Sequence, residues 1–282
     1  MKKPKILVTG SRGFLGSNLI PLLEKDFLVI PFHGDICDIE NIKKQISSNL
    51  HGVIHLAGVI AGSNKTFVEV NIVGTMNLLE VLQNQAPDLA FFISIGSAAE
   101  YGAHSDQITE STPCLPNSMY GHSKLIATEL IQGWQKYTGV PSIVLRPFNI
   151  IGPNQPVRML PAKLVEFFSQ QLPLIQIHNV NKEATRDWID VRDVSEAIYL
   201  LTQTPLAGFE IFNLGLGNIV SNEDLINVFA SIWKKDYTIG DTVYSPDQVI
   251  SNSTKIQHFL NWKPQFTLQD SVQRMYQTLR ND

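Results

Sequence analysis

KILVTGSRGFLG, residues 5–16, joins a short apolar run to three glycines, and a helical pattern follows at once. This order of strand, glycine turn and helix suits a dinucleotide site, because glycines let the main chain approach a pyrophosphate that sits on the helix N-terminus. The spacing G-x-x-G-x-x-G departs from the general G-x-G-x-x-G fingerprint, yet its place at the first strand–helix junction favours the same interpretation. The predicted phosphate cradle comprises Gly10, Arg12, Gly13, Phe14, Leu15 and Gly16.

Further apolar runs predict the sheet to which this turn belongs. Runs rich in Val, Ile, Leu and Phe recur along the chain, with helical patterns between most of them. Continuous apolar strands that alternate with helices predict an α/β fold, a Rossmann doubly wound parallel sheet covered on both faces. The link over residues 33–51 is short, so we expect one βαβ unit to have lost a strand. The predicted strands are residues 5–9, 27–32, 52–57, 90–95, 142–146 and 210–214.

A smaller C-terminal α/β lobe is expected beyond Pro147, where loops and helices replace the regular alternation. Helices are predicted over residues 159–171 and 191–202, and Ser221 with an acid three positions later marks the start of another helix. We assign residues 1–150 with 187–214 to the dinucleotide-binding part. Residues 151–186 with 215–282 form the predicted substrate-binding lobe.

Composition excludes several functions. There are 22 Lys and Arg against 26 Asp and Glu, a formal net charge of −4 that offers no basic field for nucleic acid or an anionic membrane. Cys37 and Cys114 lack metal-ligand spacing, so we expect free thiols in a reducing compartment and no metal site. The apolar run before Thr9 is too short for a signal peptide or a membrane span. We therefore expect a cytoplasmic globular protein.

Three residues after the glycine cradle suggest proton transfer chemistry. Tyr120 and Lys124 are four residues apart on a predicted helix and so share one face. An ammonium there would favour the tyrosinate, whose reference pKa of about 10 must fall by roughly three units, or about 4 kcal/mol, for work near neutral pH. Ser97 follows the predicted strand 90–95 and would hold a substrate oxygen beside Tyr120. Tyr-x-x-x-Lys alone is common, but its order after the cradle and the serine favours catalysis.

The choice between dinucleotides depends on two side chains. Asp35 stands near the distance at which an acid grips the adenosine ribose of NAD, but it lies in the shortened link and could instead face the adenine. Arg12 in the cradle suits a 2′-phosphate. We therefore favour NADP(H), with NAD(H) as the alternative.

With these motifs in place, the chain resembles the extended short-chain dehydrogenase/reductase family, also called the NAD-dependent epimerase/dehydratase family, over essentially its whole length. The segments that carry the resemblance are TGSRGFLG (9–16), HLAG (55–58), Asn71 with Gly74 and Thr75, the Ser97 segment, Tyr120 with Lys124, RPFNIIGP (146–153) and RDWIDVRD (186–193).

The resemblance implies roles for these residues. Ser97, Tyr120 and Lys124 are the implied catalytic set, and Lys124 also binds the nicotinamide ribose. The implied cofactor-binding residues, besides the cradle, are Asp35, Ile36, Leu56, Ala57, Gly58, Tyr120, Lys124 and Pro147. The implied nucleotide-sugar-binding residues are Ser97, Asn149, Arg158 and Arg186.

The absence of acidic residues directly after Ser97 narrows the set of candidate reactions. Dehydratases and decarboxylases of the family resembled carry acids directly after the catalytic Ser or Thr, whereas Ala98 and Ala99 occupy those places here. Methyl groups transfer no protons, and Glu100, displaced by one residue, is expected to point elsewhere. Two candidate reactions remain: reduction of a nucleotide-linked 4-keto-6-deoxy sugar, and 4-epimerisation with tightly bound NAD. We favour the reductase, because the chain is most similar to GDP-6-deoxy-4-keto-hexose reductases. A cofactor-binding protein without catalysis is disfavoured by the intact Tyr120 and Lys124.

Some residues have a structural alternative. We expect His55 to be a core histidine and leave the role of Asn71 open; Arg186 could pair with Asp187 on the surface instead of reaching the substrate. The helices predicted over residues 67–83 and 119–137 carry apolar stripes. The resemblance suggests a two-fold homodimer through them, and core packing is the alternative. The stripe residues are Leu125, Leu130, Ile131 and Trp134.

Overall fold

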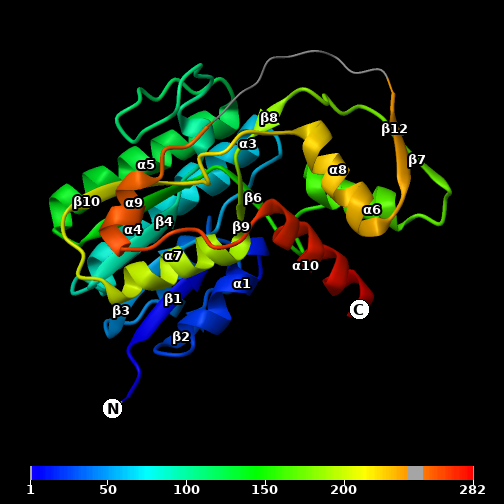
Figure 1. Cartoon of the computed structure of the whole chain (residues 1–282). Helices are drawn as coiled ribbons and strands as arrows, with labels where there is room; N and C mark the ends of the chain where they lie inside the picture. The colour runs from blue at the N-terminus through cyan, green and yellow to red at the C-terminus, as the bar shows by residue number, and fades with distance from the viewer. Residues whose placement is uncertain (1, 241–249, 282) are drawn as a thin grey trace.

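A six-stranded parallel sheet forms the centre of the larger part of the molecule (Figure 1). The computed structural model describes residues 2–240 and 250–281. Along the sheet the strands follow the order β10-β5-β4-β3-β1-β2. Their bounds are Lys5–Thr9 (β1), Leu28–Pro31 (β2), Leu50–His55 (β3), Phe91–Ile95 (β4), Ser142–Pro147 (β5) and Phe209–Leu214 (β10). All six predicted strands are confirmed, with ends shifted by at most two residues.

The shortened link between β2 and β3 sets the topology. Residues 32–49, all of which the structure describes, contain one helix, α2 (Ile39–Gln45), and no strand. The chain therefore leaves β2 on one side of β1 and returns directly to β3 on the other side, which makes β2 an edge strand. Strand order thus reverses at β1, and ligands of such folds bind at the carboxyl ends of the strands where this reversal occurs. The expected loss of a strand is confirmed.

Helices cover both faces of the sheet, and the strands alternate between the two cores. Ile6 and Val8 pack in one core, against α1 and α7, whereas Leu7 packs in the other, against α2, α4 and α5. This period of two is what a strand buried on both faces requires. The bounds are Phe14–Leu23 (α1), Gly74–Gln85 (α4), Met119–Thr138 (α5) and Val191–Gln203 (α7).

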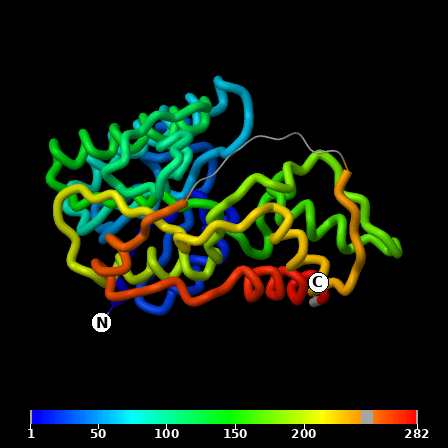
Figure 2. Tube along the Cα trace, turned by 45° about the horizontal axis from the view of Figure 1, so that its top comes forward, coloured from blue at the N-terminus to red at the C-terminus, as the bar shows by residue number. Residues whose placement is uncertain are grey.

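The smaller lobe has its own apolar core beside the sheet (Figure 1). Helix α8 begins where predicted, since Ser221 and Asp224 form a capping box. Helix α10 packs against α8 and runs along the lobe, as Figure 2 shows at the red end of the chain. The elements here are α6 (Leu160–Ser169), β7 (Leu174–Ile177), α8 (Asn222–Trp233), β12 (Asp236–Ile239) and α10 (Leu268–Asn281). Short pairings join the parts: β6 (Asn149–Ile151) with β9 (Trp188–Asp190), and β8 (Thr185–Arg186) with β11 (Val220–Ser221).

The exact division of the chain into two parts remains a prediction, and one segment argues for a different boundary. Helix α9 (Thr254–Leu260) contacts β10 and α7, and Ile256 and Trp262 belong to the same core as α1. We therefore place this segment with the sheet and not with the lobe. Within residues 2–240 and 250–281, no helix combines the length and the apolar character that crossing a bilayer requires.

The buried carboxylate of Asp193 links helix α7 to the segment that precedes α10. Asp193, on α7, is fully buried and accepts hydrogen bonds from the main-chain N–H groups of Gln265 (2.8 Å) and Phe266 (3.2 Å). Burial raises the pKa of Asp193 from 3.8 to about 6, although these hydrogen bonds oppose the shift. The folded protein therefore holds this proton more tightly than the unfolded chain does.

Asp193→Asn should change how stability depends on pH. The contribution of Asp193 to the free energy of unfolding is complete below about pH 4 and is lost as the pH rises through 6, because the folded state binds more protons in that range. Relative to the variant, the natural protein should lose up to about 3 kcal/mol between about pH 4 and pH 7, measured by urea unfolding. Asp88→Asn, at an exposed site, is the control. Parallel pH profiles for the natural protein and Asp193→Asn would contradict this account.

Candidate active site

The turn between β1 and α1 forms a cradle that only glycine permits. Gly10 has φ +65°, and a Cβ there would lie 2.7 Å from the carbonyl carbon of Leu56. A Cβ on Gly16 would lie 2.4 Å from the oxygen of Gly10. No acid stands in the first turn of α1, and no side chain caps it. The main chain therefore approaches closely enough to hold a pyrophosphate on the helix N-terminus, so these residues fit a dinucleotide.

Two cavities meet at this cradle. The larger measures about 740 Å³ and the second about 410 Å³, and Gly10, Gly13 and Gly58 line both. Of the predicted residues, the larger cavity brings together Gly10, Gly13, Phe14, Leu15, Gly16, Leu56, Gly58, Ser97, Tyr120, Pro147, Asn149, Arg158 and Arg186. The second cavity brings together Gly10, Arg12, Gly13, Asp35, Ile36, Ala57 and Gly58. Their shared glycines make one continuous site at the switch point of the sheet.

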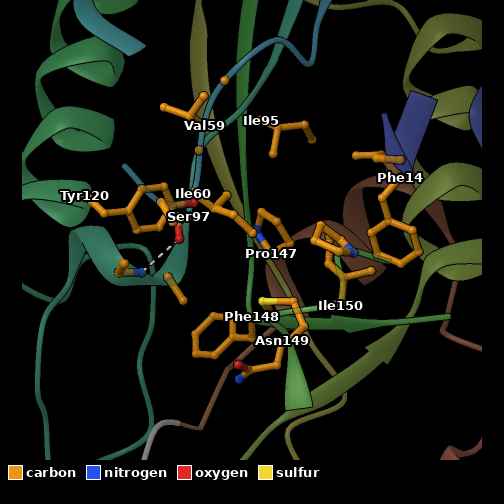
Figure 3. Close-up of a pocket in the computed structure, with 18 of the residues that line it drawn as sticks. Phe14, Val59, Ile60, Ile95, Ser97, Tyr120, Pro147, Phe148, Asn149 and Ile150 are labelled. Carbon is orange, nitrogen blue, oxygen red and sulfur yellow. Dashed lines mark hydrogen bonds between the residues drawn. The ribbon is translucent and has the colours of Figure 1, made fainter. Parts of the chain in front are cut away.

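Ser97 and Tyr120 face one another inside the larger cavity (Figure 3). The Ser97 hydroxyl accepts a hydrogen bond from the main-chain N–H of Ala99 at 3.1 Å, the dashed line in Figure 3, and it lies on the side of the Tyr120 phenol. Burial raises the pKa of Tyr120, although Ser97 lowers it in part. The phenol is therefore held in its protonated form, ready to donate.

The expected effect of Lys124 on Tyr120 is wrong for the chain by itself. The Lys124 ammonium is buried and donates to the main-chain oxygen of Ile95 at 2.5 Å. Burial lowers the pKa of Lys124, and Lys124 is not among the groups that shift the pKa of Tyr120. The Lys124 ammonium also lies close to Gly58, since a Cβ there would be 3.8 Å from Nζ, and the hydrogen bond that it makes in the described part of the chain goes to Ile95 and not to the phenol. Lys124 alone among the predicted residues lines neither cavity.

The positions after Ser97 are as predicted. Ala98 and Ala99 are among the residues that line the cavity, and Glu100 is fully buried and points elsewhere. Its carboxylate forms an ion pair with Arg146 at 2.7 Å. Among the described residues that line the larger cavity there is no Asp, Glu, His or Cys. Tyr120 is thus the side chain there with a proton to transfer.

Arginines supply the charge on the side of the cavity formed by the smaller lobe. Arg158, before α6, and Arg186, in β8, line the same cavity as Asn149. Asp187 does not lie on the surface, since it is fully buried and accepts the main-chain N–H groups of Leu216, Gly217 and Ser251. Guanidinium groups suit phosphate oxygens, so this end of the cavity favours an anionic ligand.

The second cavity contains the residues that bear on whether NAD or NADP is bound. Nη2 of Arg12 lies 3.4 Å from Nδ1 of His33, and both side chains line the cavity. A carboxylate oxygen of Asp35 accepts the main-chain N–H of Cys37 at 2.8 Å. The end of β2 therefore presents an imidazole beside a guanidinium, and sequence reasoning missed His33 because a single histidine after a strand carries no motif.

His55 and Asn71 support the site from behind. As predicted, His55 is a core residue, and its ring nitrogens lie 2.7 Å from the Thr9 hydroxyl and 3.1 Å from the Thr75 hydroxyl. Burial lowers the pKa of His55 to about 3. Asn71 bonds both the N–H (2.8 Å) and the oxygen (3.0 Å) of Val59 and donates to Ser123 at 2.9 Å. Asn71 therefore ties the loop after β3 to α5, next to Lys124.

Several residues that line the larger cavity were not anticipated. Most come from the loop after β3, the loop after Tyr101 and the turn before α6, whereas Phe148 and Ile150 lie within the RPFNIIGP segment but were given no role. These residues are Val59, Ile60, Ala61, Gly102, Ala103, Asn117, Phe148, Ile150, Gln155, Pro156 and Met159.

Comparisons with known proteins agree with this geometry. A family model described as "NAD dependent epimerase/dehydratase family" matches residues 6–215. The chain is 27% identical to dTDP-glucose 4,6-dehydratase 1 of Escherichia coli K12, covering 96% of this chain and 91% of that protein. It is also 27% identical to GDP-6-deoxy-D-mannose reductase of Pseudomonas aeruginosa (95% and 94% covered). The solved structure of RMD from Pseudomonas aeruginosa complexed with NADPH superimposes with a TM-score of 0.91 at 25% identity, covering 99% of both chains.

Proposed function

We propose that this chain, which belongs to the NAD dependent epimerase/dehydratase family, is a cytoplasmic NAD(P)H-dependent reductase of a nucleotide-linked 4-keto-6-deoxy sugar. The observation that carries the proposal is the larger cavity, where Tyr120 and Ser97 stand together and no carboxylate is found among the described lining residues. Reduction of a ketone needs one proton donor at the carbonyl oxygen. The cavity supplies that donor and no second acid or base.

The same observation argues against dehydration, although dehydratases are among the relatives. Removing water from a sugar needs groups that take and give protons at neighbouring carbons. Ala98 and Ala99 stand on the cavity wall where acids of that kind are expected, and Glu100 is buried behind them. We therefore exclude dehydration from the proposal.

The chain's own residues provide the proton and the orientation. The substrate ketone oxygen accepts hydrogen bonds from the Ser97 hydroxyl and the Tyr120 phenol. A nicotinamide cofactor bound at the glycine cradle would supply the hydride for the ketone carbon. Tyr120 transfers its proton to the oxygen, so that the C=O bond becomes CH–OH and Tyr120 is left as tyrosinate. Burial holds the free phenol protonated before this step, which suits the reducing direction.

The charged groups of the site support a nucleotide diphosphate substrate and NADP(H). Arg158 and Arg186 would hold the diphosphate, with Asn149 beside them. Arg12 and His33 would hold a 2′-phosphate in the second cavity, which Asp35 also lines and where its carboxylate could instead meet a ribose hydroxyl of NAD. The similarity to a structure solved with NADPH supports the same preference, with NAD(H) as the alternative.

A 4-epimerase remains the second candidate, because the family description includes epimerases and because one tyrosine suffices for both chemistries. An epimerase removes and returns hydride at the same carbon and therefore keeps its NAD bound. A reductase releases oxidised cofactor in each turnover. Cofactor stoichiometry thus separates the two.

We further propose a homodimer through α4 and α5. Met119, Ile126 and Tyr137 are exposed and lie 7 and 11 residues apart, which places them on one helical face. Met76 on α4 is exposed as well. Of the stripe residues named from the sequence, Leu130, Ile131 and Trp134 follow the alternative of core packing, since they pack in or against the core beside the sheet. A second copy of the chain would cover the outward stripe.

The proposed reaction is tested with purified protein and a panel of nucleotide-linked 4-keto-6-deoxy sugars. We expect one equivalent of NADPH to be oxidised for each ketone reduced, and slower turnover with NADH. Interconversion of 4-epimers by protein that retains NAD, without net oxidation, would support the second candidate. Cofactor binding with no turnover of any sugar in either direction would contradict both.

Tyr120→Phe should abolish turnover while preserving the site. Loss of the proton donor is expected to lower kcat about 100-fold to 10,000-fold, because a positioned acid contributes that much. NADPH affinity, followed by fluorescence titration, should remain within about three-fold, since burial of the ring against Phe67 is unchanged. A rate close to that of the natural protein would refute the role of Tyr120.

Arg12→Ala should weaken NADPH binding about 10-fold to 100-fold, since a charge-assisted hydrogen bond is worth roughly 1.5–3 kcal/mol. NADH binding should change little. Lys163→Ala removes the same charge at an exposed site on α6 and is the matched control. Equal losses for both cofactors in Arg12→Ala would show that Arg12 does not read the 2′-phosphate.

Ile126→Glu should convert the dimer into monomers, because a carboxylate buried between two copies of α5 is costly. Leu279→Glu, which changes an equally exposed apolar residue on α10, should leave the mass unchanged. Sedimentation equilibrium measures both. A monomeric natural protein, or a dimer unaffected by Ile126→Glu, would contradict the proposed interface.

A further inference from the structure

Glu100 is a fully buried carboxylate to which the proposed reaction gives no role. Its Oε2 atom accepts hydrogen bonds from Nε (2.8 Å) and Nη2 (2.7 Å) of Arg146 and from the Thr128 hydroxyl (2.9 Å). Arg146 is also buried and lies over the ring of Tyr101 at 4.6 Å. Glu100 therefore joins the end of β4 to β5 and α5 through one side chain.

The other oxygen of Glu100 reaches the catalytic loop. Oε1 accepts the main-chain N–H of Ser97 at 2.8 Å, and the Ser97 hydroxyl in turn accepts from the loop that carries Glu100. A Cβ at Gly96 would lie 2.4 Å from Oε1, so the carboxylate is packed directly against the residue before Ser97. The conformation of Ser97 thus depends on a carboxylate whose own position is fixed by side chains from two other elements, β5 and α5.

We infer that Glu100 is a positioning residue, which holds the main chain of Ser97 so that the serine hydroxyl meets both Tyr120 and the substrate oxygen. The inference deepens the proposed reductase reaction and rests on it for its kinetic test. Glu100 touches neither cavity, so it acts through Ser97 and not on the substrate.

A contribution to the stability of the fold is by itself a weak explanation for the buried ion pair of Glu100 and Arg146. Replacing both members of a buried ion pair by apolar side chains of similar size is often neutral or stabilising, because two charges no longer need to be desolvated. Position is a better reason, since the hydrogen bonds to Oε2 leave Oε1 fixed toward Ser97. The negative charge also raises the pKa of both Tyr120 and Lys124, which favours their protonated forms.

Two double variants separate positioning from folding. Glu100→Gln with Arg146→Met removes both charges but keeps an amide oxygen that can accept the Ser97 N–H. Glu100→Met with Arg146→Met removes the same charges and that acceptor as well. Neither variant leaves an unpaired charge in the core, which is the reason for not testing Glu100 alone.

The two variants should differ in kcat and agree in cofactor binding. We expect the Gln variant to stay within about five-fold of the natural kcat and the Met variant to fall about 100-fold, as expected for a misplacement near 1 Å. The KM for NADPH should change less than about three-fold in both. The inference would be overturned if the two double variants had the same kcat, whether both kept the natural value or both lost activity to the same extent.

Crystal structures of the same proteins give a readout independent of turnover. The Ser97 hydroxyl should keep its place beside Tyr120 in the Gln variant and move by about 1 Å or more in the Met variant. An unmoved serine in the Met variant would overturn the inference, even if no sugar is reduced by the natural protein. Failure of the proposed reaction, in contrast, is seen with the natural protein alone.

If the Met variant does not fold, Thr128→Val tests the same contact more gently. It keeps the ion pair and removes one of the donors that fix Oε2. We expect kcat to fall about three-fold to ten-fold with cofactor KM unchanged, because one neutral hydrogen bond is worth about 1 kcal/mol. Thr138→Val, near the end of α5, is the control, and equal kcat values in the two variants would overturn the inference.

Discussion

No side chain fits between the first turn of the chain and the end of β3, and the site depends on that constraint. The Gly10 position touches the carbonyl carbon of Leu56 with no room for a Cβ, and Gly16 closes on Gly10 in the same way. Because the main chains approach so closely, the N-terminus of α1 opens onto the crevice where the strand order reverses. The other groups of the site lie along this same edge of the sheet, from Ser97 at the end of β4 to Asn149 after β5, and their positions relative to a bound cofactor depend on it.

The sequence predicted the sheet well because its signals are local. A strand buried on both faces is a continuous apolar run, and each such run became a strand of the parallel sheet. Most residues taken from motifs also meet in the two joined cavities. Their roles stay predictions, but their proximity could be expected, since carboxyl ends of parallel strands share one edge.

What the sequence could not show depends on contacts between distant segments. Helical spacing placed Lys124 on the same face as Tyr120, but it could not show that the main-chain oxygen of Ile95, 29 positions earlier, accepts a hydrogen bond from the ammonium. The sequence analysis placed Arg146 only at the end of a predicted strand and in the RPFNIIGP segment, and the fold reveals that it neutralises Glu100. The apolar residues of α5 looked alike in sequence, although Ile131 faces the sheet and Ile126 faces outward. Patterns within one element carry no information about which partner the other elements bring.

The missing strand also determines how the sheet ends. β2 is an edge only four residues long, and Pro31 has no N–H with which to pair another strand. At the opposite edge, the Lys255 ammonium donates to the main-chain oxygen of Ile211 and to Glu210 of β10. Short strands, proline and lysine at sheet edges discourage the pairing of one molecule's sheet with another's. A chain shortened in this way therefore limits the pairing of its sheet with that of another molecule at both borders, through a short strand with proline at one and a lysine of α9 at the other.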